Sequence, residues 1–141
     1  MINSFDNYLR LGKVKKKTPD IEESRSLINK AINRLKYAKL KNIDKDTAAF
    51  ILEDSYEAVR ESAQALMSIK GYKPYSHEAT IAFLEHDYKD IFNENEIHDF
   101  DRFRQLRNDS IYKAVIVNED DAKKCIDFSE KIIKKIKGLI R

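Results

Sequence analysis

The chain has few of the residues that interrupt regular secondary structure. Its 141 residues include only three Gly and two Pro, and no Trp. The five breakers stand where helices are expected to start or stop, at Gly12, Pro19, Gly71, Pro74 and Gly138. The long stretches between them suit helices and leave few turns of the kind that a sheet requires. The scarcity of breakers therefore predicts an all-α fold.

The single Cys and the lack of long apolar runs exclude further classes of protein. Cys125 cannot form a disulfide framework within one chain, and its place on the apolar side of the last helical pattern predicts a buried thiol. No run approaches the roughly 18 apolar residues that cross a bilayer, and the N-terminus lacks the apolar segment of a signal peptide. We therefore expect a cytoplasmic protein without redox chemistry.

Charge is abundant but unevenly distributed. The net charge is only +3 although 36% of the residues are charged. Basic residues gather near both ends of the chain, and an acidic stretch covers residues 85–101. Basic ends can contact phosphates, and they can equally be solvated helix faces.

The apolar residues predict one helical domain. A hydrophobic content of 42% suffices for one core in a chain of this length. We expect a partly mobile leader over residues 1–17 and a single domain over 18–141. Thr18, Pro19 and Asp20 suit a helix start, with Thr18 as the cap. Apolar spacings of three and four predict an up-and-down bundle of about five helices, over residues 18–41, 44–70, 76–92, 97–112 and 118–140.

The fourth of these helices contains a polar segment, Arg107-Asn108-Asp109-Ser110-Ile111-Tyr112. Asn, Asp and Ser compete for backbone hydrogen bonds and are poor choices inside a helix. Three in a row mark the best candidate site of the chain. The alternative is a helix face that frays into solvent near its end.

With these features the chain resembles the HEPN family, small all-helical domains common in prokaryotic toxin and defence systems. The resemblance covers about residues 20–140. It rests on the second-helix run from Tyr56-Glu57-Ala58-Val59-Arg60 to Gly71, on the Ser76-His77 that follows, and on the pair Arg107-Asn108. The family motif is an Arg, often followed by a polar residue, with a His four to six positions later. Here Tyr112 occupies the His position.

The resemblance implies a function for the polar segment. Many members are metal-independent endoribonucleases whose motifs meet across a homodimer cleft, and many are encoded beside a minimal nucleotidyltransferase that serves as antitoxin. Arg107, Asn108 and Tyr112 would then form the catalytic site, with Asp109 and Arg104 in support and no metal or cofactor. Because Tyr112 replaces the His, cleavage would be weakened or lost.

The chemistry of the residues fits this assignment in part. The planar guanidinium of Arg107 can hold two phosphate oxygens. Asn108 and Tyr112 are four residues apart and share a helix face. A phenol with a pKa of about 10 donates a hydrogen bond better than it accepts a proton. Asp109 could supply the missing base, but the neighbouring Arg107 lowers the pKa of its carboxyl, which makes it a weaker base. Arg107 and Tyr112 can also have structural roles, with Arg107 paired with the acidic stretch and Tyr112 half-buried in the core.

Other patterns are less specific. His86 and Asp90 have metal-ligand spacing, but such residues are usually solvated. The segment Lys70-Tyr72-Lys73-Tyr75 interleaves charge with aromatic rings as RNA-stacking loops do, and it equally suits a turn between helices. The leading hypothesis is therefore a homodimeric, RNA-associated HEPN protein of a toxin-antitoxin or defence type. The alternatives are a non-catalytic module that binds a nucleotidyltransferase or a nucleotide, and a bundle used only for assembly.

Overall fold

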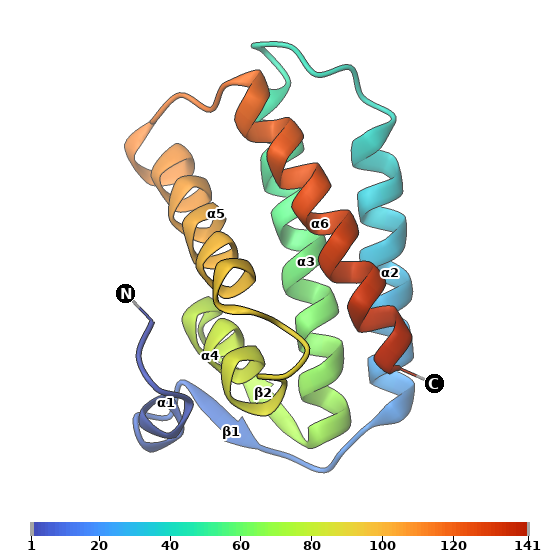
Figure 1. The fold of residues 1–141 in the computed structure, drawn as a ribbon, viewed down its shortest axis with the longest axis vertical. Helices are drawn as coiled ribbons and strands as arrows, with labels where there is room; N and C mark the ends of the chain where they lie inside the picture. Colours follow the sequence, from blue (N-terminus) through green and yellow to red (C-terminus); the bar gives the residue numbers. More distant parts are fainter. Residues whose placement is uncertain (1, 141) are drawn as a thin grey trace.

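The computed structural model of the chain is an all-α helical bundle, as the sequence predicted (Figure 1). It describes residues 2–140, so Met1 and Arg141, the outer ends of the predicted leader and domain, lie outside the described part. The bundle is formed by α2 (Ile21–Lys39), α3 (Ala48–Lys70), α4 (His77–Asp87), α5 (Glu94–Lys113) and α6 (Glu119–Leu139). The short helix α1 (Phe5–Arg10) and the strands β1 (Val14–Lys16) and β2 (Tyr72–Pro74) complete it.

Helix α3 is the centre of the core. It contacts α2, α4, α5 and α6, and its inward residues, among them Leu52, Tyr56 and Leu66, are almost fully buried. Burying one such side chain contributes about 1.5 to 3 kcal/mol to folding. The helix ends at Gly71, whose left-handed conformation (φ 82°) lets its N–H reach the carbonyls of the last turn. The other four helices of the bundle, α2, α4, α5 and α6, all pack against α3.

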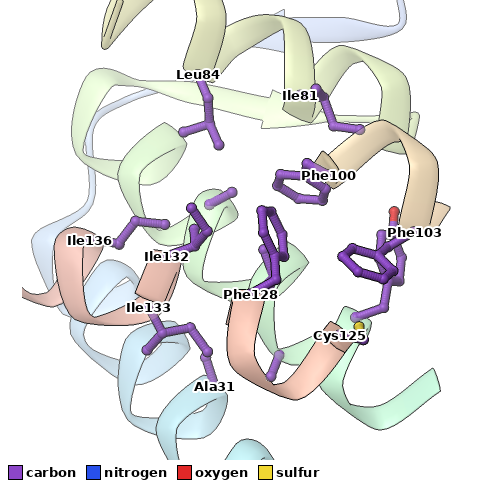
Figure 2. Packing of buried hydrophobic residues seen from close by; sticks show 14 of the residues in the cluster. Ala31, Ile81, Leu84, Phe100, Phe103, Cys125, Phe128, Ile132, Ile133 and Ile136 are labelled. Atoms are coloured by element: carbon purple, nitrogen blue, oxygen red, sulfur yellow. The ribbon is translucent and has the colours of Figure 1, made fainter. Parts of the chain in front are cut away.

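Helix α6 packs along α3 and also contacts α2, and its side chains reach α5. A capping box formed by Asn118 and Asp121 begins it, at the residue where the fifth predicted helix starts. Figure 2 shows Phe128 of α6 beside Phe100 and Phe103 of α5, with ring centroids 6.1 Å and 5.4 Å apart. Cys125 is buried as predicted, and burial raises the pKa of its thiol to about 12.

Several predicted helix boundaries were wrong: α3 begins at Ala48 instead of residue 44 and α5 at Glu94 instead of residue 97, and the start of α2 and the end of α4 also differ. The cap of α2 is Asp20, whose carboxylate accepts from the N–H of Glu23 at 3.0 Å, and not Thr18. Helix α4 ends at Asp87, so the predicted continuation to Phe92 is a turn in which the N–H of Phe92 donates to the carbonyl of Tyr88. In both places a local hydrogen bond decides the boundary, and apolar periodicity does not report it.

The N-terminal segment and the turn after α3 contain a two-stranded antiparallel sheet that the sequence did not predict. Strand β1 pairs with β2, with Lys15 opposite Lys73. Helix α1 lies beside it, and Phe5 packs edge-on against Tyr72 at 5.1 Å and Phe83 at 5.7 Å. Three-residue strands carry too little alternation to be recognised from sequence. The partial mobility and the bounds of the leader stay predictions.

Within residues 2–140, none of the helices has both the length and the apolar character that spanning a bilayer requires.

Candidate functional site

A partly buried hydrogen bond joins the middle of α3 to the start of α4. The hydroxyl of Tyr56 lies 3.0 Å from Nδ1 of His77, and the two rings are 5.7 Å apart. Tyr56 also packs edge-on against Phe100 of α5, with centroids 5.9 Å apart. Burial raises the pKa of the Tyr56 phenol well above its usual value. A neutral tyrosine therefore holds three helices and one histidine in a fixed arrangement.

His77 occupies the first turn of α4, where Ser76 is the helix cap and accepts from the N–H of Ala79. Its side chain is only partly exposed. Burial first, and then the positive charge of Arg60, lowers the pKa of His77 from 6.5 to about 4. Glu57 acts in the opposite direction, whereas Arg107 and Arg104 lower the pKa further. The imidazole is therefore neutral at physiological pH and can accept a proton.

Arg60 and Glu57 form an ion pair on α3, beside His77. Arg60 Nε lies 3.0 Å from Oε1 and 3.1 Å from Oε2 of Glu57, and its Nη1 donates to Gln64 at 3.1 Å. Burial alone would raise the pKa of Glu57, but the hydrogen bonds and charge of Arg60 outweigh it and lower the pKa. Glu57 therefore stays ionised and orients Arg60.

Helix α5 supplies two further arginines with different surroundings. Arg104, only 11% exposed at its side chain, donates to Asp101 at 2.7 Å and lies 3.6 Å from Glu78. Arg107 donates from Nη1 to Oδ1 of Asn108 at 3.0 Å. Among residues 2–140 no carboxylate forms an ion pair with Arg107, so the predicted pairing with the acidic stretch belongs to Arg104 instead. Arg107 thus keeps an uncompensated charge close enough to His77 and Tyr56 to shift the pKa of both.

The other predicted site residues lie at the exposed end of α5. Asp109 is 3.5 Å from Lys113. Tyr112 is 77% exposed, so it is not the half-buried core residue that was considered as an alternative. Helix α5 ends just beyond it at Ala114, which has a left-handed conformation with φ 53°. The structure therefore brings Arg104 and Arg107 toward His77 and leaves Asp109 and Tyr112 at the surface.

Tyr56, Glu57, Arg60 and His77 were not among the predicted site residues. A signal for them was nevertheless present in the sequence. Glu57 and Arg60 are three residues apart beside an otherwise apolar helix seam, and His77 directly follows a helix cap. Only their convergence with Arg104 and Arg107 from a distant helix identifies them as one cluster.

A small cavity opens beside this cluster. Its volume is about 290 Å³, and Arg60, His77 and Tyr75 are among the residues that line it. The guanidinium of Arg60 beside the neutral imidazole of His77 suits an anionic ligand such as a phosphodiester, with the imidazole placed to accept a proton. Within residues 2–140 there is no group of three or more His, Cys, Asp or Glu side chains arranged to hold a metal ion.

Comparison with known proteins identifies the family. The family model for the HEPN domain matches residues 24–139, which include most of α2 and the whole of α3, α4, α5 and α6. Neither the comparison with curated proteins nor the one with solved structures gave a match. Because the family model covers most of the chain, this protein belongs to the HEPN domain family.

Proposed function

We propose that the chain is a metal-independent endoribonuclease of the toxin-antitoxin or defence type, acting as a homodimer on RNA. The observation that supports this most directly is the uncompensated charge of Arg107 near the neutral imidazole of His77. Membership of the HEPN family, which is associated with ribonuclease-like or nucleotide-binding functions, agrees with it.

The proposed reaction is the attack of the ribose 2'-oxygen on the adjacent phosphorus. A bond forms between the 2'-oxygen and phosphorus while the bond to the 5'-oxygen breaks, which leaves a 2',3'-cyclic phosphate and a 5'-hydroxyl. Arg107 holds the phosphate oxygens and stabilises the charge that develops on them. Asn108 orients Arg107 through its carbonyl oxygen.

In this proposal His77 supplies the imidazole that the motif lacks at position 112. It takes the proton of the 2'-hydroxyl, and the exposed phenol of Tyr112 from the second copy gives its proton to the leaving 5'-oxygen, which becomes the 5'-hydroxyl. Water then takes the proton from His77 and returns one to Tyr112. Burial first, and then the charges of the neighbouring guanidinium groups, lower the pKa of His77 to about 4. A bound phosphodiester offsets their charge and so moves the pKa of His77 upward, toward the range of an effective base.

The exposed apolar end of α5 favours a second function, a module that binds a protein partner. Ile116 is 88% exposed, and Ile111 and Val115 beside it are also exposed. Such a patch next to Tyr112 suits a contact with a second copy or with a nucleotidyltransferase-type antitoxin. This function predicts stable co-purification with the product of the neighbouring gene and no cleavage of RNA.

The test is incubation of the purified protein with tRNA or mRNA in the presence of EDTA, followed by analysis of the new ends. Arg107→Ala is expected to lower the cleavage rate by about 100- to 1,000-fold and His77→Asn by about 100- to 10,000-fold. Arg102→Ala is the matched control, because Arg102 is an exposed arginine of the same helix that pairs with Asp99. The absence of cleavage by the wild type and by Tyr112→His would contradict the ribonuclease proposal.

A further inference from the structure

The outer face of the two-stranded sheet concentrates positive charge. In the antiparallel register Lys15 lies directly opposite Lys73, so both side chains leave the same face. The N–H of Tyr75 donates to the carbonyl of Lys13 at 2.8 Å, which extends the pairing by one step and places these two residues opposite each other. One surface is therefore formed by Lys13, Lys15, Lys73 and Tyr75. We call it the hairpin face, a name that refers to the antiparallel strand pair alone, since α2 and α3 lie between β1 and β2 in the chain.

The arrangement of charges on the hairpin face is unfavourable in the free protein. Like charges directly opposite each other destabilise a sheet. Among residues 2–140 none of the three lysines forms an ion pair that would offset this cost. Both Lys15 and Lys73 lie over the ring of Tyr75, at 5.2 Å and 5.5 Å from its centroid. Tyr75 as a residue is nevertheless 54% exposed. Two ammonium groups beside an accessible aromatic ring match a phosphate backbone with a base between phosphates.

The hairpin face is built on a firmly packed support. On the inner face Val14 is fully buried and Tyr72 packs against Phe5 and Phe83. At the end of the two-stranded sheet the N–H of Lys17 donates to the carbonyl of Gly71 at 2.9 Å. A ligand on the outer face therefore meets side chains whose backbone is already in place, which reduces the entropy cost of binding.

The hairpin face is continuous with the candidate site. Tyr75 lines the cavity of about 290 Å³ together with Arg60 and His77. Along the chain Tyr75 is separated from His77 only by Ser76, the cap of α4, and Figure 1 shows β2 leading into α4. The hairpin face and the cavity beside His77 therefore meet at Tyr75.

We propose that the hairpin face is a binding site for single-stranded RNA. A base stacks on Tyr75, the flanking phosphates contact Lys15 and Lys73, and the strand continues to Arg60 and His77. A single strand is required because the bases of a duplex are stacked on each other and cannot reach the ring. This inference rests on the proposed ribonuclease function and defines which form of RNA its site takes.

The test is the affinity for a fluorescent oligonucleotide of about ten nucleotides, measured by anisotropy. A 2'-O-methyl RNA serves as the probe, because its blocked 2'-oxygen cannot attack and binding is measured without cleavage. Tyr75→Ala is expected to weaken binding by about 5- to 150-fold and Tyr75→Phe to retain most of it. Lys15→Ala with Lys73→Ala is expected to weaken binding and to reduce the salt dependence, lowering the slope of log affinity against log salt by about 1.4.

The double variant Lys45→Ala with Lys123→Ala is the matched control, since it removes two exposed lysines from the α2–α3 loop and from α6. The inference would be overturned if the hairpin variants bound the probe as tightly as the wild type. It would also be overturned if the control variant lost as much affinity as they do, or if the wild type did not bind the probe. Preserved helical circular dichroism excludes misfolding. If Arg107→Ala abolishes cleavage while the hairpin variants bind normally, only the hairpin inference fails. If the wild type binds through the hairpin face but cleaves nothing, only the ribonuclease proposal fails.

Discussion

The unusual environment of His77 makes the stability of the protein depend on pH. Folding lowers the pKa of the imidazole from 6.5 to about 4, so the unfolded chain binds a proton in this range that the folded protein does not. The contribution of neutral His77 to stability is complete above about pH 6.5, is lost progressively as the pH falls, and is gone below about pH 4. The perturbation that removes this dependence is His77→Asn, because the asparagine oxygen stands near the position of Nδ1 and still accepts from Tyr56.

The expected magnitude follows from the pKa. For a fully buried group, a pKa lowered from 6.5 to about 4 would correspond to about 3 kcal/mol in the free energy of unfolding. Because the ring of His77 is partly exposed, solvent screening reduces this to about 1 to 2 kcal/mol. Urea unfolding from about pH 7.5 to about pH 4.5 should therefore show that the wild type loses this much more stability than His77→Asn.

The comparison between variants removes the contribution of the carboxylates, which titrate in the same range in both proteins. His98→Asn is the control, since His98 is an exposed histidine on α5, and its curve is expected to run parallel to that of the wild type. Parallel curves for the wild type and His77→Asn would refute the reasoning, because the guanidinium groups and burial would then have no differential effect on the imidazole.

Three further predictions concern stability and reactivity. Gly71→Ala should lower the free energy of unfolding by about 2 to 4 kcal/mol, because φ is 82° and the new Cβ would lie 2.7 Å from the carbonyl oxygen of Lys17; a loss below about 0.5 kcal/mol in urea unfolding would contradict this. Ala114→Gly should raise the free energy of unfolding by about 0.5 to 1 kcal/mol by relieving the left-handed conformation after α5, and calorimetry showing no rise in melting temperature would disagree. Cys125, buried and with a pKa of about 12, should react with a thiol reagent only in urea, and rapid labelling of the native protein would show that α6 opens.

The sequence alone was sufficient for the helical bundle and its core. Apolar spacing and the positions of Gly71 and Asn118 locate α3 and the start of α6, because amphipathic periodicity and helix ends are local properties of the chain. The resemblance to the HEPN family also rested on local segments, the second-helix run, Ser76-His77 and Arg107-Asn108, and it is confirmed by the family model. The boundaries at Asp20 and Asp87 were missed because single hydrogen bonds decide them.

Only the tertiary structure decided which polar residues meet. Arg107 and Tyr112 belong to one sequence segment, yet Tyr112 is at the surface while Arg107 lies near His77, thirty positions earlier in the chain. The pairing of Lys15 with Lys73 likewise joins segments that no local pattern connects. Hydrophobic periodicity reports which face of a helix is buried, but not which helix it meets. The convergence of charged groups from α3, α4 and α5 therefore had to come from the packing itself.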